Sequence, residues 1–218
     1  PADRENVTAG SKSASCGSFE RRVEVLSFAR MRGIWEGIHM TAEESMKRLR
    51  EGAERYETES AYSGDVSGKV RERTAGGQHP FATIVTCSDS RVIPEAIFSC
   101  GIGDIFVIRT AGSVIGAHEL ASIEYAAHHL HVPLTVVLGH THCGAVGAAI
   151  AGETEGNIGV ITQAIREAIG EETDPLKATR RNAENSVRRI CEDLQGGEAH
   201  RVCGAVYDIE TGKVVWSE

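Results

Sequence analysis

The segment Phe81-Ala-Thr-Ile-Val-Thr86, which runs directly into Cys87-Ser-Asp-Ser-Arg91, decides the fold of this chain. It is a short run of apolar and β-branched residues, and residues 105–108 and 134–138 form two more runs of the same kind. Continuous apolar runs of this length are typical of strands that are buried on both faces of a parallel sheet. We therefore predict an α/β fold with a central, mostly parallel sheet flanked by helices.

Helical patterns lie between and after these runs. A capping box of Thr41 and Glu44 predicts a helix that extends to about Tyr56. The other expected helices of this region cover residues 119–130, 145–151, 158–169 and 175–194. Residues 60–79 are rich in glycine and charge, which favours a loop. Two β-rich runs within residues 201–216, on either side of Glu210-Thr-Gly212, predict a C-terminal hairpin at the edge of the sheet.

The N-terminal part has a different character. Residues 1–18 are polar and rich in Gly, Ser and Ala, which is typical of a loose arm. Residues 19–38 carry an apolar stripe at helical spacing. We therefore expect an N-terminal arm and helix over residues 1–40, followed by an α/β domain over residues 41–218.

The composition narrows the classes of function. Of the 218 residues, 41% are apolar and 25% are charged, which are ordinary values for a globular domain. The net charge of −8 disfavours binding to nucleic acid, because it repels phosphate backbones. No apolar run approaches the roughly 18 residues of a membrane span, and no signal-peptide pattern is visible. We expect a cytoplasmic protein with no nucleic-acid or membrane partner.

Six cysteines are too few, in a chain of this length, for a fold held together by disulfides. Cys100, Cys191 and Cys203 lie in or beside apolar segments, so we predict that they are small buried side chains. Cys87 and Cys143 lie instead among polar and glycine residues. These two are the candidates for chemistry.

Both candidates belong to clusters that follow a predicted strand, Cys87-Ser-Asp-Ser-Arg91 and His140-Thr-His-Cys-Gly144. In an α/β sheet, ligand-binding residues gather just past the carboxyl ends of the strands. If the two strands are neighbours, Cys87, His140 and Cys143 meet at one point. Two thiolates and one imidazole suit zinc and leave a fourth tetrahedral position for water or substrate. On these short motifs alone, packed cysteines and a solvated histidine would be the commoner interpretation.

Asp89 and Arg91 add an acid and a base to the first cluster. A carboxylate beside such a metal can orient water, and a guanidinium forked onto it keeps it ionised. Taken alone, the pair is more simply explained as a surface ion pair at the start of a helix.

Several motifs, taken together and in order, resemble the β-class carbonic anhydrase family. The resemblance covers residues 41–151. Within this range, residues 49–56 are similar to the helix that precedes the core in the family. The motifs are Gln78-His-Pro80, Cys87-Ser-Asp-Ser-Arg-Val92, Gly103-Asp-Ile-Phe-Val-Ile-Arg-Thr-Ala-Gly112, Ser122-Ile-Glu-Tyr-Ala126 and Leu138-Gly-His-Thr-His-Cys-Gly-Ala145.

The resemblance implies a reversible hydration of carbon dioxide to bicarbonate and a proton, by attack of zinc hydroxide. It implies that Cys87, His140 and Cys143 hold one Zn²⁺ per subunit. Asp89 and Arg91 would form the catalytic dyad, with Asp89 as a fourth zinc ligand in a closed form of the site. The residues implied for the substrate pocket, some of them from a neighbouring subunit of a homodimer or homotetramer, are Gln78, Phe106, Tyr125 and Gly144. His129 matches a position proposed as a proton relay, although a helix-surface histidine is an equally good interpretation.

Three positions depart from the family pattern. Thr110 and Ser113 stand where the family usually has asparagine, so we expect the local hydrogen-bond network to differ. Ile84 stands where the branch with a bicarbonate effector site has tryptophan, so we expect no effector site of that kind.

Two other functions stay open. A related chemistry on the same fold is the hydrolysis of carbonyl sulfide or carbon disulfide, although the Asp89–Arg91 pair and Gln78 favour carbon dioxide. A non-catalytic zinc-binding or redox module would use Cys87 and Cys143. A structural zinc site wants a fourth protein ligand, however, and no further Cys or His lies at the usual spacing.

Overall fold

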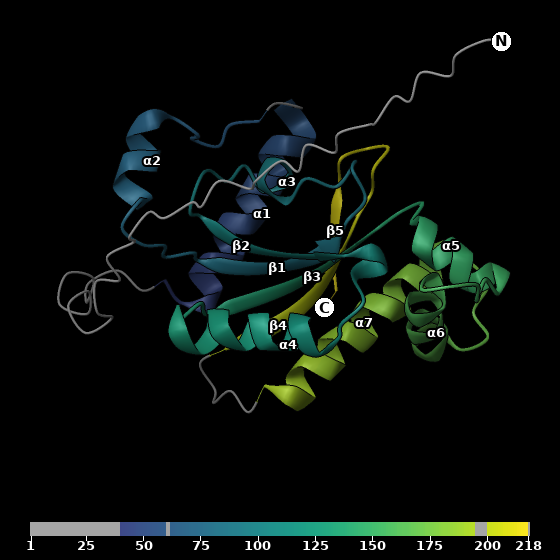
Figure 1. The fold of residues 1–218 in the computed structure, drawn as a ribbon. Helices are drawn as coiled ribbons and strands as arrows, with labels where there is room; N and C mark the ends of the chain where they lie inside the picture. Colours follow the sequence, from purple (N-terminus) through teal and green to yellow (C-terminus); the bar gives the residue numbers. More distant parts are fainter. Residues whose placement is uncertain (1–39, 60–61, 195–199, 218) are drawn as a thin grey trace, which may run out of the picture. The chain divides into compact units, whose positions relative to one another are not determined.

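The computed structural model of this protein describes residues 40–59, 62–194 and 200–217 (Figure 1). All of them lie within one compact unit, His39–Glu218. The N-terminal arm and helix predicted over residues 1–40 lie outside the described residues, apart from Met40. None of the described helices is long and apolar enough to cross a membrane.

The fold is built on a five-stranded sheet with the strand order β2-β1-β3-β4-β5. The strands are β1 (Ala82–Cys87), β2 (Ile105–Thr110), β3 (Leu134–His140), β4 (Arg201–Tyr207) and β5 (Val214–Trp216). The first four pair in parallel, and β5 pairs antiparallel to β4 at the edge. The mostly parallel sheet and the C-terminal hairpin are therefore confirmed.

Helices cover both faces of the sheet, as a parallel sheet requires (Figure 1). On one face, α1 (Ala42–Glu59) and α3 (Pro94–Ile97) contribute to a core that contains Leu49 and Ile84. On the other face, α4 (Ala117–Glu124) and α7 (Pro175–Asp193) pack on Val85 and Val137. Every residue of β1 and β3 is buried. Burying one such aliphatic side chain contributes about 1.5–3 kcal/mol.

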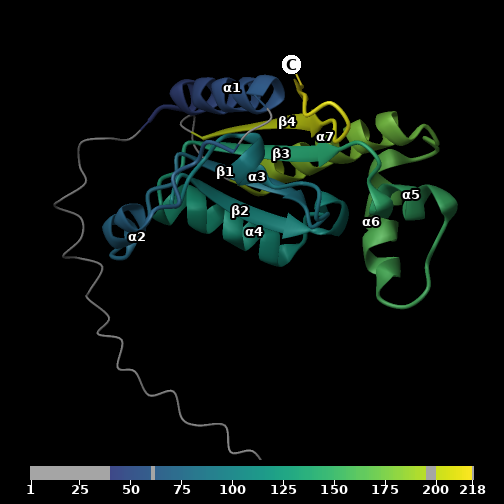
Figure 2. The same ribbon diagram turned by 90° about the horizontal axis from the view of Figure 1, so that it is seen from above.

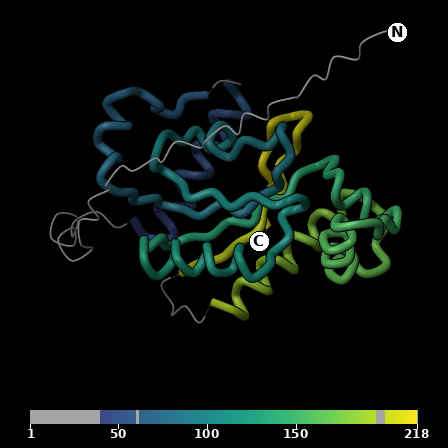
Figure 3. The backbone as a smooth tube through the Cα atoms, viewed as in Figure 1, coloured from purple at the N-terminus to yellow at the C-terminus, as the bar shows by residue number. Residues whose placement is uncertain are grey.

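Two further helices lie beyond the carboxyl ends of the strands (Figure 2). They are α5 (Gly144–Ala151) and α6 (Ile158–Ile169), and both match their predicted ranges closely. Figure 3 traces the chain from the end of β3 through this pair of helices and back along α7. The helices therefore lie next to the strand ends where the two polar clusters were predicted to meet.

The start of α1 confirms the predicted capping box. Thr41 N donates to Glu44 Oε2 at 2.7 Å, and Glu44 N donates to Thr41 Oγ1 at 3.2 Å. Two of the N–H groups that a helix leaves without a partner in its first turn are thereby satisfied.

Three expectations from the sequence are wrong. Residues 60–79 are not all loop, because α2 (Gly68–Thr74) forms where Ser67 Oγ caps Val70 N and Val70 is buried. The helix expected over residues 119–130 begins earlier and changes at Tyr125 into a π-helical turn, η3 (Tyr125–His129), with a wider hydrogen-bond spacing. Cys191 is exposed rather than buried, since it lies on the outer face of α7.

Candidate metal centre

The pairing of β1 with β3 brings the two polar clusters together. The strands run in parallel, with Thr86 opposite Leu138, so Cys87 at the end of β1 lies beside the end of β3. His140 is the last residue of β3, and Cys143 is the N-cap of α5. The neighbouring strands that the metal-site hypothesis required are confirmed.

The three side chains form a compact, buried group. One ligand atom each of Cys87, His140 and Cys143 lies within 4.8 Å of the other two. Ligand atoms around a tetrahedral zinc ion are about 3.5 Å apart, so small side-chain movements suffice to hold one. His140 Nε2 is buried and has no hydrogen-bond partner among the described residues. Because a buried ring nitrogen without a partner is costly, this donor set fits zinc.

The electrostatics of the group favour a thiolate at Cys87. Cys143, together with His140 and the backbone N–H groups of Gly112 and Asp89, lowers the pKa of Cys87 to about 4 although burial opposes this. The contact with Cys87, together with burial, raises the pKa of Cys143. Burial alone would lower the pKa of His140, but Cys87, the Thr141 carbonyl and Asp89 raise that pKa overall. A bound metal cation would replace the protons of this group, because thiol and imidazole ligands bind metals in their deprotonated forms.

The backbone orients the histidine. His140 Nδ1 lies 2.8 Å from the carbonyl oxygen of Thr141, which can only accept, so Nδ1 carries the proton and Nε2 is free to bind a metal. Thr141 is itself fixed, because its N–H donates to the Tyr207 carbonyl at 2.9 Å and its Oγ1 accepts from Ile209 N at 3.1 Å. The β4–β5 hairpin thus supports the peptide that sets the ring orientation.

Asp89 and Arg91 lie beside the three ligands. Arg91 Nε donates to Asp89 Oδ1 at 2.9 Å, and Arg91 Nη2 donates to Asp89 Oδ2 at 2.7 Å. This contact with Arg91 holds the pKa of the Asp89 carboxyl well below its usual range. Asp89 Oδ2 lies 4.0 Å from His140 Nε2, and the Asp89 side chain is only 16% exposed. The pair is therefore part of the centre and not a separate surface ion pair.

Arg91 also joins the two clusters, since its Nη2 donates to the His142 carbonyl at 3.1 Å.

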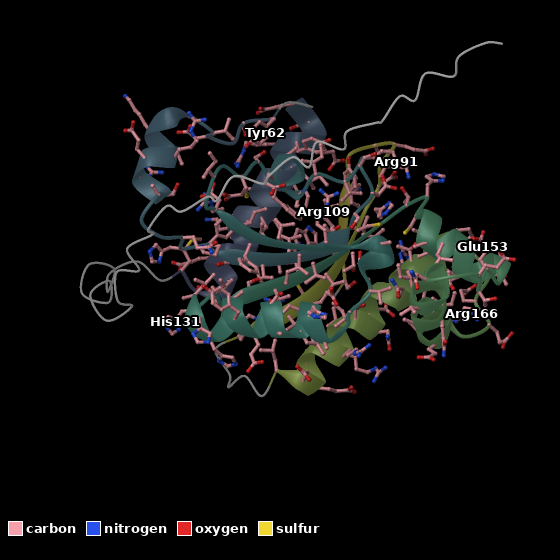
Figure 4. The ribbon with its side chains drawn as sticks, in the orientation of Figure 1. Tyr62, Arg91, Arg109, His131, Glu153 and Arg166 are labelled. Carbon is pink, nitrogen blue, oxygen red and sulfur yellow. The ribbon has the colours of Figure 1, made fainter. Side chains whose placement is uncertain are left out.

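A second arginine, Arg109 on β2, holds the loop after β1 from the other side. Its guanidinium donates to the carbonyls of Cys87, Asp89 and Val92 at 3.2, 2.8 and 2.9 Å. Arg91 and Arg109 are both labelled in Figure 4, at the end of the sheet where β1 finishes. The sequence motif contained Arg109 but did not indicate this contact.

Backbone amides complete the surroundings of Cys87. Its Sγ accepts from Gly112 N at 3.3 Å and from Asp89 N at 3.4 Å. Gly112 belongs to the 3₁₀ turn η2 (Ala111–Ser113). Two of the departures from the family pattern lie here, Ser113 within the turn and Thr110 directly before it. Thr110 Oγ1 donates to the Val114 carbonyl at 2.8 Å, so this departure still fixes the turn. Ile84, the third departure, is fully buried in the core.

The other predicted pocket residues do not all reach this centre within one chain. Phe106 pairs with Thr83, four residues before the level of Cys87, which is about 13 Å along the strand. Its ring lies 6.3 Å from that of Tyr125, which stacks at 5.3 Å on His129. Figure 4 shows His131, which follows η3, at the end of the sheet opposite Arg91. Phe106, Tyr125 and His129 therefore lie together, but away from their own chain's Cys87.

Gly144 and Gln78 differ in their positions. Gly144 is the first residue of α5, directly after Cys143, and no described atom lies within 4 Å of the place that a Cβ would take there. The start of α5 is thus close to the three ligands, and Gly144 is exposed there. Gln78 is exposed in the loop before β1.

Comparisons with known proteins give a consistent family. A family model described as carbonic anhydrase matches residues 82–214. Carbonic anhydrase 2 of Mycobacterium tuberculosis is 50% identical over 112 residues, which cover 51% of this chain and 54% of that protein. The carbonic anhydrase of Synechococcus elongatus is 34% identical over 197 residues, covering 78% of this chain and 71% of that protein. The chain thus spans about half the length of the M. tuberculosis relative.

Solved structures agree with the sequence matches. The Coccomyxa β-carbonic anhydrase in complex with acetazolamide has a TM-score of 0.62 and 26% identity, over 78% of this chain and 85% of that one. The β-carbonic anhydrase CafA of Aspergillus fumigatus has a TM-score of 0.61 and 26% identity, over 80% of this chain and 89% of that one. The range that the family model matches, residues 82–214, includes β1, β3 and the group of Cys87, His140 and Cys143.

Proposed function

This chain belongs to the β-carbonic anhydrase family, and we propose on that basis that it catalyses the reversible hydration of carbon dioxide to bicarbonate and a proton. The observation that carries the proposal is the buried group of Cys87, His140 and Cys143 with Asp89 beside it. β-Carbonic anhydrases use zinc, and these three side chains would hold it. Bound zinc would supply a Lewis acid that activates water near neutral pH.

The chain's own residues have distinct roles in this proposal. Asp89, kept ionised by Arg91, accepts a hydrogen bond at Oδ2 from the attacking water and orients it toward carbon dioxide. Arg109 holds the loop so that Asp89 stays in place. Gly144, which is exposed in the first turn of α5, would offer its N–H to the bicarbonate oxygens. For Asp89 to act as a fourth zinc ligand, its carboxylate would have to leave Arg91, which engages both of its oxygens.

We also propose a homodimer or homotetramer in which one subunit completes the pocket of another. Tyr125 is 38% exposed and Phe106 lies on the edge strand β2, so both can reach a partner's centre although they lie away from their own. Gln78 would likewise line the pocket of a partner subunit, and His129 would serve that subunit's centre as a proton relay. The test is sedimentation together with Tyr125→Ala, which should lower hydration activity without lowering zinc content. A fully active monomer would contradict this arrangement.

Carbonyl sulfide or carbon disulfide hydrolysis is the closest rival activity. The experiment is a side-by-side assay of the zinc-loaded protein with carbon dioxide and with both sulfur compounds. We expect turnover of carbon dioxide to exceed that of either sulfur compound. Turnover of the sulfur compounds alone would reject the proposal.

A non-catalytic zinc module is the second rival. Among the described residues only Cys87, His140 and Cys143 group as metal ligands, and a structural zinc site is almost always closed by a fourth. The test is to remove zinc with a chelator and to follow the fold by circular dichroism. We expect the fold to persist while hydration is lost. Unfolding on zinc removal would favour the structural role.

The proposed location is the cytoplasm. Cys87 and Cys143 are free thiols in the structure, and a centre built on thiolates is best preserved under reducing conditions. Cell fractionation with an antibody against the chain tests this location.

A further inference from the structure

The N–H group that reaches Cys87 Sγ from Gly112 is presented by a strained turn. Gly112 and Ser113 both have positive φ, at 69° and 55°. A Cβ at Gly112 would lie 2.7 Å from Ile165 Cδ1, so glycine is required there. Ser113 has no such freedom, so its left-handed backbone is strained. Such a turn persists only if neighbouring groups hold it.

Helix α7 supplies those groups. Asn182 is 6% exposed in the layer between the helix and the sheet, and its Nδ2 donates to the Gly112 carbonyl at 2.8 Å. One turn further along, Ser186 Oγ donates to the Ser113 carbonyl at 3.4 Å. Burying an amide is costly unless it is hydrogen-bonded, and an apolar side chain would fill the same space without that cost. The buried asparagine on this helix face is therefore explained by its hydrogen bond and not by packing.

We propose that Asn182 is a positioning residue for the Cys87 thiolate. It fixes the turn at Gly112 so that the Gly112 N–H points at Sγ, although Asn182 itself touches no metal ligand in the hydrogen-bond network of the described residues. The N–H group stabilises negative charge on the sulfur and limits its movement, as outer partners of metal ligands do. The inference rests on the proposed function, because it treats Cys87 as a zinc ligand.

The test measures zinc affinity by competition with a chromogenic chelator. Asn182→Leu keeps the number and branching of the side-chain heavy atoms but removes the amide, and we expect it to weaken zinc binding about 10- to 100-fold. Ser186→Ala removes the longer of the two hydrogen bonds, and we expect a smaller but measurable loss of zinc affinity, about 2- to 10-fold. In cobalt-substituted protein, the thiolate-to-metal absorption band should shift in Asn182→Leu.

A matched control separates positioning from general loss of stability. Thr135→Val removes a different buried hydrogen bond, from Thr135 Oγ1 to His200 Nε2 at 3.0 Å, at the far end of β3. It should destabilise the zinc-free protein without changing zinc affinity or the cobalt band.

The outcomes are distinct. If Asn182→Leu is destabilised like the control but binds zinc with wild-type affinity, the inference is overturned. If Asn182→Leu does not fold, unchanged zinc affinity in folded Ser186→Ala overturns it equally. A wild-type chain that binds no zinc would overturn the proposed function, and this inference with it.

Discussion

At the scale of single residues, Arg91 keeps Asp89 in place through its guanidinium and also through its backbone N–H, which donates to Asp89 Oδ1 at 3.0 Å. We predict that Arg91→Gln lowers kcat/KM for carbon dioxide about 10²-fold, because Asp89 loses both its orientation and its counter-charge. Zinc content, measured on the same samples, should not change. Arg91→Lys should retain an intermediate activity, since it keeps the charge but loses the fork. Wild-type kcat/KM in Arg91→Gln would refute this role.

The sequence predicts the proximity of some residues of the centre but not of others. Cys87, Asp89 and Arg91 stand within five positions, so their proximity follows from the motif itself. Asn182 lies 70 positions from its partner Gly112, and nothing in its own segment distinguishes it from a surface asparagine. Its role depends on the way α7 packs on the sheet, which the sequence pattern does not give.

At the scale of elements, the close approach of α1 to α3 depends on Gly52. A Cβ at this position would lie 2.0 Å from the carbonyl oxygen of Phe98, which is backbone and cannot move aside cheaply. We predict that Gly52→Ala lowers the free energy of unfolding by about 3 kcal/mol. Gly68→Ala is the control, because its Cβ would lie no nearer than 3.7 Å, at Arg71 Nη2, to any described atom outside the helix backbone and the adjacent residues. Urea unfolding of both variants checks this, and equal stabilities would show that the contact is relieved without cost.

The elements that the sequence predicted well are the ones with strong local signals. The runs at β1, β2 and β3 are continuous, apolar and rich in β-branched residues, and the capping box at Thr41 marks the start of α1. The helix α2 was missed because it has 7 residues and one buried side chain, Val70, which is too little for a periodic pattern. The change to a π-helical turn at Tyr125 has no sequence signal of its own, because a helical pattern of side chains does not distinguish the two hydrogen-bond spacings.

At the scale of the whole molecule, His200 makes stability depend on pH. Its Nδ1 lies 2.8 Å from the Val132 carbonyl and its Nε2 lies 3.0 Å from Thr135 Oγ1, so the neutral ring is hydrogen-bonded at both nitrogens. Burial, together with the nearby His128, lowers the pKa of His200 below its ordinary value, although the Val132 carbonyl opposes this. The unfolded chain therefore binds a proton more readily than the folded one as the pH falls below about 6.5.

The resulting prediction concerns acid sensitivity. The free energy of unfolding should fall as the pH decreases through about 6.5, and the loss should be complete below the lowered folded-state pKa of His200. His200→Gln has no charge to gain, so its stability should fall less over the same range. Parallel stability curves for the two proteins, from urea unfolding at several pH values, would exclude His200 as the cause.

The central claim about the molecule is that Cys87, His140 and Cys143 hold a zinc ion that serves the hydration of carbon dioxide. The most direct measurement is stopped-flow hydration of carbon dioxide, with zinc content determined on the same samples, for the wild-type chain and for Cys143→Ala. We expect about one zinc per chain and rapid hydration in the wild type, with both lost in a folded Cys143→Ala variant. A wild-type protein that holds its zinc but does not hydrate carbon dioxide, or a variant that hydrates it undiminished, would contradict the account.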